Sequence, residues 1–213
     1  MLIDLLRRTG LIAILRGVTS REVAEIGAAL FAAGFRIIEV PLGSPDALAS
    51  ITLLRAALPA ACLVGAGTVL IPAQVDDVRR AGGELIVMPH ADPAVIRAAR
   101  AAHLPVAPGV ATPTEALAAL AAGADALKVF PADLLGAATL EAWRDVLPAG
   151  TPLVAVGGIT PDNLAAFVAA GATGAGLGSA LYRPGASARQ VAARASAFIA
   201  AWRATQAPPA RAE

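Results

Sequence analysis

The sequence contains very little lysine, cysteine or histidine. Its 213 residues include 16 arginines but a single lysine, Lys128, together with one cysteine and two histidines. One cysteine cannot form an internal disulfide, so we expect Cys62 to be a small core residue in a chain that works in the reducing cytoplasm. His90 and His103 lie 13 positions apart and predict no metal cluster, so no metal or other cofactor is expected.

Strong net charge and unbroken apolar runs are also missing. The formal net charge of +1 gives no electrostatic reason to expect nucleic acid, and no basic run predicts contact with a membrane surface. Charged residues interrupt residues 1–17, which argues against a signal peptide. The uncharged stretches 56–75 and 163–182 could span a bilayer by length, but Gly and Pro interrupt both, so we interpret them as soluble core.

Apolar residues are abundant and regularly punctuated. They make up 57% of the chain, enough to bury the core of one large α/β domain. Ala-Gly and Leu-Pro junctions alternate at spacings of 24, 24, 22, 19, 24 and 24 residues, and each unit fits one strand and one helix. These junctions lie at Gly34, Leu58, Gly82, Leu104, Gly123, Leu147 and Gly171. We expect one domain over residues 1–204 and a disordered, proline-containing tail over 205–213.

The repeated unit predicts a barrel. A short helix at residues 2–8 precedes eight expected strands, near 11–16, 36–42, 63–69, 85–90, 105–110, 126–131, 152–157 and 174–178. Prolines 45, 72, 93, 113 and 161 each mark the expected first position of a helix. Alternating strands and helices indicate parallel pairing, and eight units favour a (β/α)8 TIM barrel over an open sheet. The glycine-rich segment 65–70 lacks the third glycine of a dinucleotide fingerprint.

The lone lysine lies in an apolar segment that reads as a buried strand ending at Pro131. Burial disfavours the ammonium form of Lys128 and makes the neutral, nucleophilic amine accessible near neutral pH, as Schiff-base chemistry requires. Strand two and strand six face each other across an eight-stranded ring. Glu39, on the same face as Ile37, can therefore meet Lys128, on the same face as Phe130. The pair fits an amine nucleophile with a carboxylate proton shuttle; a structural ion pair is the alternative.

Further polar residues and glycines gather at the expected carboxyl ends of the strands, where barrel enzymes place their sites. These positions are Arg16, Thr68, Pro89 with His90, Gly157 with Gly158, and Gly178 with Ser179. Taken singly they could be a surface charge, a helix cap and turns, but together they favour a site. Backbone N–H groups at the two glycine loops are suited to bind phosphate. His103 precedes a Leu-Pro junction, where a surface or packing role is expected.

Several motifs occur in the order found in a known family. They are Leu11-Ile-Ala-Ile-Leu-Arg-Gly17, Ile38-Glu-Val-Pro-Leu42, Gly65-Ala-Gly-Thr-Val69, Leu127-Lys-Val-Phe-Pro131, Val156-Gly-Gly158 and Gly176-Leu-Gly-Ser179. Together they resemble the 2-keto-3-deoxy-6-phosphogluconate and phosphogalactonate aldolases over residues 10–203. The resemblance implies a class I lyase, usually a homotrimer, that cleaves a phosphorylated keto-deoxy acid to pyruvate and glyceraldehyde 3-phosphate.

The resemblance also implies a role for each matching residue. Lys128 would form the Schiff base and Glu39 would act as general acid and base. Arg16 and Thr68 would hold the pyruvoyl end, and the glycine loops with Ser179 would hold the phosphate. Phe130 and Val156 complete the expected substrate-binding set, which is Arg16, Thr68, Phe130, Val156, Gly157, Gly158, Gly178 and Ser179.

Two positions favour the galactonate branch of the family. Gly43 stands where the gluconate-type pattern has arginine, and Val156 stands where that pattern favours threonine. His90 departs from the small or amide residue expected after Pro89 and is a candidate determinant of aldehyde specificity. Three alternatives stay open: the C4-epimeric gluconate substrate, a sugar-phosphate isomerase or epimerase that uses Glu39 as base, and a non-catalytic sugar-phosphate binding barrel.

Overall fold

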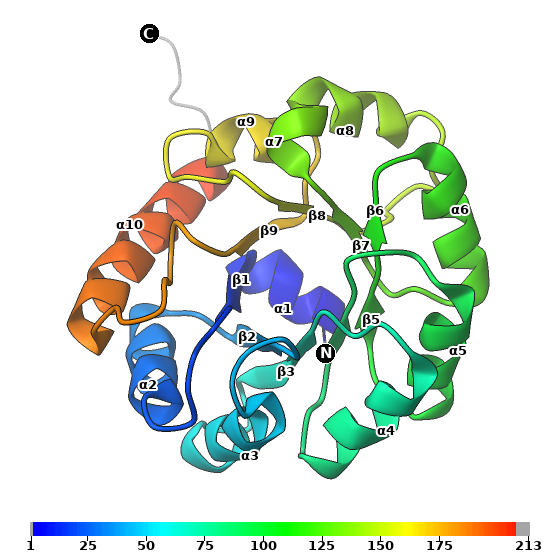
Figure 1. Ribbon diagram of the computed structural model, residues 1–213. Coiled ribbons are helices and arrows are strands. Elements are labelled where there is room, and N and C mark those ends of the chain that lie inside the picture. The colour runs from blue at the N-terminus through cyan, green and yellow to red at the C-terminus, as the bar shows by residue number, and fades with distance from the viewer. Residues whose placement is uncertain (1, 208–213) are drawn as a thin grey trace, which may run out of the picture.

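The computed structural model describes residues 2–207, and in that part of the chain parallel strands form a ring that helices surround (Figure 1). The strands are β1 (Leu11–Ile14), β2 (Ile37–Pro41), β3 (Leu63–Gly67), β4 (Ile86–Val87), β5 (Val106–Ala107), β6 (Gly109–Val110), β7 (Leu127–Val129), β8 (Leu153–Val156) and β9 (Gly174–Leu177). The helices are α1 (Leu2–Thr9), α2 (Val23–Ala33), α3 (Ala47–Ala57), α4 (Pro72–Arg80), α5 (Pro93–Ala101), α6 (Pro113–Ala122), α7 (Ala132–Leu135), α8 (Ala137–Arg144), α9 (Leu164–Ala169) and α10 (Ala188–Gln206).

The strand order confirms the predicted barrel and divides its fifth strand. Neighbours pair in the order β5-β4-β3-β2-β1-β9-β8-β7-β6, all in parallel. The expected strand over residues 105–110 appears as β5 and β6, separated by Pro108, which has no N–H to donate to a ladder. β5 pairs with β4 and β6 pairs with β7, so this one segment joins the two halves of the ring.

The helix boundaries follow the predicted proline positions in three of five cases. Pro72, Pro93 and Pro113 are the first residues of α4, α5 and α6. The prediction was wrong for Pro45 and Pro161, because α3 begins at Ala47 and α9 begins at Leu164. In both cases the proline begins a turn of two or three residues that precedes the helix.

Two glycines end helices as expected. Gly34 after α2 has φ 118° and Gly123 after α6 has φ 105°, and each donates its backbone N–H to carbonyls of the last turn. A side chain at these left-handed positions would be strained, so glycine allows the chain to leave the helix and enter the next strand.

Strand side chains alternate between two apolar layers. Ile38 and Val40 of β2 belong to the large cluster between the ring and its helices. Ile37 of β2 and Ala126 beside β7 belong to a second cluster inside the ring. The predicted faces of these two strands are therefore confirmed, and the residues that share the inner face with Ile37 and Ala126 are directed into the barrel.

Helix α1 closes the amino-terminal end of the barrel. Leu2 and Leu6, four residues apart on one helical face, are buried in the inner cluster, whereas Arg7 and Arg8 are exposed. Figure 1 shows α1 lying across the ring. Apolar side chains of α1 therefore cover the amino-terminal ends of the strands, and the carboxyl ends remain available for a site.

The last helix passes the expected end of the domain. α10 continues to Gln206, two residues beyond the predicted boundary at 204, and most of the predicted tail, 208–213, lies outside the described residues. Within residues 2–207, none of the helices combines the length and the apolar character needed to cross a membrane.

Candidate active site

The structure brings Glu39 and Lys128 together inside the barrel. Glu39 lies in β2 and Lys128 in β7, and when β5 and β6 are counted as one divided strand these two strands are four positions apart in either direction around the ring. Both side chains are buried, with exposed fractions of 2% and 6%. They line the same small internal cavity, whose other walls are apolar side chains of β1, β4, β5 and β8 together with Gly176.

Burial dominates the electrostatics of this pair. Desolvation raises the pKa of Glu39 to about 7, although the nearby charges of Lys128 and Arg16 oppose the shift. Desolvation lowers the pKa of the Lys128 amine, and Arg16 lowers it further, while Glu39 has the opposite effect. A lysine with a lowered pKa is a better nucleophile at neutral pH, and a carboxyl group with a pKa near 7 both accepts and donates protons there.

The glycine that ends β3 makes room for the Glu39 carboxylate. A Cβ atom placed on Gly67 would lie 1.7 Å from Oε2 of Glu39 and 2.3 Å from its Cδ. Oε2 is buried and has no hydrogen-bond partner among the described residues. The next residue, Thr68, has a left-handed backbone with φ 56°, which is strained for a β-branched side chain. An unsatisfied carboxylate oxygen and a strained backbone residue therefore occur close together at this point of the barrel.

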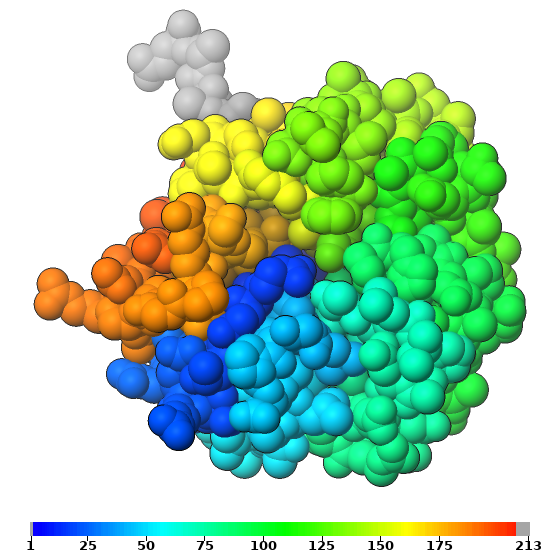
Figure 2. Space-filling view, in the orientation of Figure 1, coloured from blue at the N-terminus to red at the C-terminus, as the bar shows by residue number. Residues whose placement is uncertain are grey.

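A cavity of about 490 Å³ opens at the carboxyl ends of the strands. Its lining residues are Ile14, Arg16, Lys128, Phe130, Val156, Gly157, Gly158, Ile159, Thr160, Gly176, Gly178, Ser179, Ala180 and Arg183. In the space-filling view the molecule is hollowed where the blue segment after β1 meets the yellow and orange segments around β8 and β9 (Figure 2). Lys128 lies at its inner end, with Nζ 5.0 Å from the centre of the half-exposed Phe130 ring, which permits a cation–π contact.

The two glycine loops form one side of this cavity. Gly157 and Gly158 follow β8 with φ 104° and φ 65°. A Cβ atom on Gly158 would lie 2.3 Å from the Cβ of Asp133 in α7, so a larger residue would push the loop off α7. After β9, the carbonyl of Gly178 accepts hydrogen bonds from Leu181 and Tyr182, which winds the chain into a single turn beside Ser179. At these glycines both loops thus present backbone to the cavity.

Arg16 is held by a contact from a neighbouring loop. The Gly17 N–H donates to Oγ of Ser44 at 2.9 Å, and the same hydroxyl lies 3.4 Å from the Leu15 carbonyl. Ser44 is buried and follows β2, so the loop after β2 fixes the backbone on both sides of Arg16. The guanidinium is thereby placed in the cavity, close enough to Lys128 to lower its pKa.

Two positions singled out from the sequence stand apart from the rim cavity. Thr68 follows β3 directly, next to the glycine that meets the Glu39 carboxylate, but is not among the cavity's lining residues. His90 follows β4, and its Nδ1 is buried without a hydrogen-bond partner among the described residues. Sequence reasoning missed Arg183, although its position one helical turn after Ser179 was a usable signal. The expected binding set also left out five further lining residues, although Gly176 belongs to a motif noted in the sequence: Ile14, Ile159, Thr160, Gly176 and Ala180.

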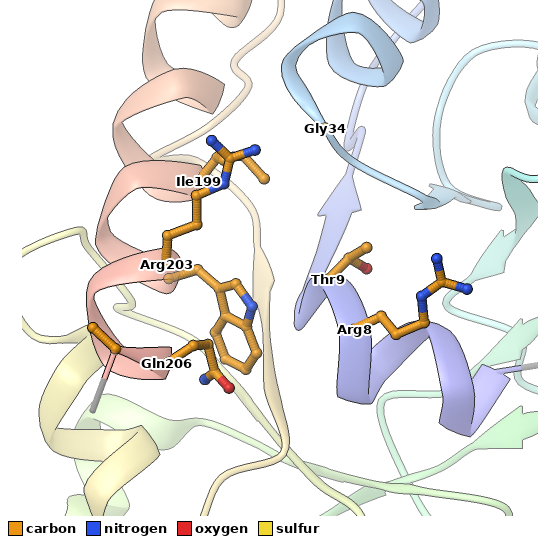
Figure 3. A pocket seen from close by; sticks show the side chains of 8 residues that line it. Arg8, Thr9, Gly34, Ile199, Arg203 and Gln206 are labelled. Carbon is orange, nitrogen blue, oxygen red and sulfur yellow. The ribbon is translucent and has the colours of Figure 1, made fainter.

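A second hollow, of about 360 Å³, lies at the opposite end of the barrel between α1 and α10. Figure 3 shows Arg8 and Thr9 on one side of it and Arg203 and Gln206 on the other, with the two guanidinium groups on opposite sides. None of the described residues that line it is a lysine, an aspartate or a glutamate. Among residues 2–207, no group of three or more His, Cys, Asp and Glu side chains is arranged to hold a metal ion.

Comparison with known proteins agrees with the chemistry of the rim cavity. A 2-dehydro-3-deoxy-6-phosphogalactonate aldolase of Escherichia coli (strain K12) is 48% identical over 193 residues, which cover 91% of this chain and 94% of that protein. A probable 2-dehydro-3-deoxy-6-phosphogalactonate aldolase of Rhizobium meliloti (strain 1021) is 50% identical over 192 residues, or 90% of this chain and 91% of that protein.

The same family appears in a solved structure and in a family model. A structure described as native KDPGal superposes with a TM-score of 0.91 at 47% identity and covers 92% of this chain and 95% of its own. The model of the KDPG and KHG aldolases matches residues 2–194. With a buried lysine and carboxylate at the base of a rim cavity, the chain belongs to the KDPG and KHG aldolase family and is a carbon–carbon lyase.

Proposed function

We propose that this aldolase cleaves 2-dehydro-3-deoxy-6-phosphogalactonate to pyruvate and D-glyceraldehyde 3-phosphate. The observation that carries the proposal is the convergence of the chain's lone lysine with a carboxyl group of raised pKa inside the barrel. The rim cavity then supplies the rest of the site. Arg16 lies near Lys128 for the substrate carboxylate, and the glycine loops with Ser179 lie on the side suited to a phosphate.

The reaction uses these two residues in sequence. The neutral amine of Lys128 attacks the C2 ketone, and loss of water with a proton from Glu39 gives a protonated imine. The Glu39 carboxylate next accepts the proton of the C4 hydroxyl, the C3–C4 bond breaks, and its electron pair moves into an enamine as the aldehyde forms. Glu39 returns the proton to C3, and water hydrolyses the resulting imine to release pyruvate. A carboxyl pKa near 7 suits both directions of this transfer.

The choice of the galactonate epimer depends on two positions beside the site. Val156 ends β8 and lines both the inner cavity and the rim cavity, so an apolar group stands where the substrate passes from Lys128 to the glycine loops. Gly43 has open space around its Cα, where the gluconate-type pattern has an arginine. The two relatives that are 48% and 50% identical are named for the galactonate epimer, in agreement with these positions.

Borohydride trapping tests the Schiff base directly. Pyruvate with borohydride is expected to inactivate the enzyme and to leave one reduced adduct per chain on Lys128. Because the sequence has no other lysine, the N-terminal amine is the competing primary amine, and peptide mapping distinguishes the two. Lys128→Arg keeps the charge but forms no productive imine, so it should show neither adduct nor cleavage. An active wild-type enzyme that cannot be trapped would favour the isomerase or epimerase reading.

A substrate panel tests the epimer. The two C4 epimers are supplied separately, and released pyruvate is followed with a coupled dehydrogenase. A higher kcat/KM for the galactonate epimer is expected. A preference for the gluconate epimer would overturn the substrate assignment while leaving the aldolase chemistry intact, and binding without pyruvate release from either would indicate a non-catalytic sugar-phosphate protein.

We also propose that the enzyme is a homotrimer of the cytoplasm. Large apolar side chains are exposed on α3 and in the turn before α4, at Leu48, Leu53, Leu70 and Ile71, and such a surface favours association. The buried, unpaired Cys62 is compatible with a reducing compartment. Light scattering at micromolar concentration is expected to give three times the chain mass, and a monomer mass would contradict the trimer.

A further inference from the structure

Arg183 lines the rim cavity on the side of the two glycine loops, and none of the roles described above accounts for it. We propose that Arg183 is a specificity-determining residue that binds the substrate phosphate through its two terminal guanidinium nitrogens. This inference rests on the proposed function, because it concerns the phosphate of the same substrate. In this proposal the enzyme selects phosphorylated aldol substrates through a charged side chain as well as through the backbone of the glycine loops.

The backbone of Arg183 is held on both sides. The preceding Tyr182 is buried, and its hydroxyl donates a 3.0 Å hydrogen bond to Glu22 beside α2. The following Pro184 packs against Gly17, where a Cβ atom would lie 2.8 Å from the proline ring. Arg183 is therefore an exposed residue between two anchored neighbours, which limits the backbone entropy that this turn loses on binding a ligand.

The guanidinium is oriented by the turn that carries the phosphate loop. Nε donates to the carbonyl of Ser179 at 3.0 Å, one helical turn earlier in the chain. Within residues 2–207 no group pairs with the two terminal nitrogens, and no carboxylate forms an ion pair with Arg183. A planar guanidinium with its terminal nitrogens available is suited to bidentate contact with phosphate oxygens.

The charges around the cavity give this cation a function. Arg16 and Lys128 occupy the inner part of the cavity, where the keto acid reacts. The charged side chain beside Gly158 is acidic, because Asp133 of α7 packs directly against this glycine, although Asp133 is not one of the lining residues of the cavity. A phosphate dianion bound only by backbone N–H groups would be repelled by this carboxylate. Arg183, from the facing loop, supplies the compensating positive charge.

The test compares Arg183→Gln with Arg183→Lys and with Arg189→Gln as a matched control. Arg189 is an exposed arginine of α10 that does not line the cavity. For each variant, kcat/KM is measured with the phosphorylated aldol and with the same aldol lacking the phosphate, and pyruvate trapping by borohydride is recorded. Arg183→Gln should lose roughly 10- to 100-fold more efficiency with the phosphorylated substrate, the scale of a charge-assisted hydrogen bond. Arg183→Lys should recover part of the loss, because lysine keeps the positive charge but lacks the two parallel N–H donors of the guanidinium.

The outcomes separate this inference from the proposed function. A wild-type enzyme that forms no pyruvate adduct would overturn the proposed function and this inference with it. If the adduct forms normally but Arg183→Gln loses equal efficiency with both substrates, or no more than Arg189→Gln, Arg183 does not bind the phosphate. A phosphate-dependent loss together with a retained adduct supports the assignment, because a general folding defect would reduce both activities alike.

Discussion

Replacement of Gly67 by alanine tests whether the position of the Glu39 carboxylate is essential. The new methyl carbon would lie 1.7 Å from Oε2, 2.3 Å from Cδ and 2.6 Å from Oε1, so it cannot coexist with the carboxylate in its present place. Gly67 does not adopt a left-handed φ, and the substitution therefore brings no backbone strain of its own. Either the carboxylate turns away from Lys128 or β3 moves outward.

Both responses lead to measurable losses. Displacing a general acid and base is expected to lower kcat by roughly 100-fold or more. Overfilling a packed interior is expected to lower the free energy of unfolding by about 1–3 kcal/mol. Pyruvate release gives the first quantity and urea unfolding gives the second. For the unfolding measurement Gly43→Ala is the matched control, because a Cβ atom there would meet nothing within 4 Å.

A double-mutant cycle then identifies the cause of the loss. Glu39→Asp shortens the side chain by one methylene and withdraws the carboxylate from Gly67. If the clash alone is responsible, Gly67→Ala should cost much less in the Glu39→Asp background than in the wild type. Wild-type turnover in Gly67→Ala, or fully additive losses in the double variant, would refute the inference that glycine is required at position 67 to make room for the Glu39 carboxylate.

Three further predictions follow from burial and packing. Burial raises the pKa of Glu39 from 4.5 to about 7, so between these pH values the native state holds a proton that the unfolded chain has released, and wild-type stability falls as pH rises. Glu39→Gln should escape this loss, so in urea unfolding its free energy of unfolding should gain up to about 3 kcal/mol relative to wild type between pH 4.5 and 7. Its turnover should drop roughly 100-fold or more. Parallel stability curves for the two proteins across this pH range would contradict the raised pKa. Gly158→Ala places a side chain at a left-handed φ and creates a clash with Asp133. It should raise KM for the phosphorylated substrate by roughly tenfold or more and change KM for the non-phosphorylated substrate less. Equal changes in the two KM values would show that this loop does not bind the phosphate. Burial also raises the pKa of the Cys62 thiol to about 11, so a disulfide reagent should label it slowly in the native protein and rapidly in denaturant, and fast native labelling would be inconsistent with the packed core.

The sequence was most informative where a strict period or a rare residue was present. The two-residue period of strands placed Glu39 and Lys128 on inward faces, and the regular junctions predicted the eight-unit ring. The sequence shows that Pro108 has no N–H to donate within the fifth strand. Its effect on pairing depends on β4 and β7, which lie elsewhere in the chain, so the division into β5 and β6 was not predicted. The starts of α3 and α9 were missed because the intervening turns depend on local backbone geometry that proline alone does not determine.

The residues that sequence reasoning missed at the site are those whose roles depend on contacts between loops. Arg183 reaches the cavity because its turn folds back on Ser179, and Arg16 is held by Ser44 from a different loop. Gly67 was part of a recognised motif, yet the reason for glycine at that position became clear only when β3 was seen beside Glu39. Such relations join segments about 20 to 30 residues apart or turn within a loop, and they follow no period.

The closure of the barrel by α1 determines the order in which the two products leave. Leu2 and Leu6 fill the amino-terminal end, so in the binding mode proposed above a substrate that reaches Lys128 through the rim cavity has its phosphate end nearest the solvent. After the carbon–carbon bond breaks, the aldehyde phosphate stands between the covalently held three-carbon fragment and the opening. Cleavage should therefore be kinetically ordered, with the aldehyde departing first and pyruvate last. In the direction of synthesis pyruvate should bind before the aldehyde, so product-inhibition patterns would reveal a barrel with a single entrance.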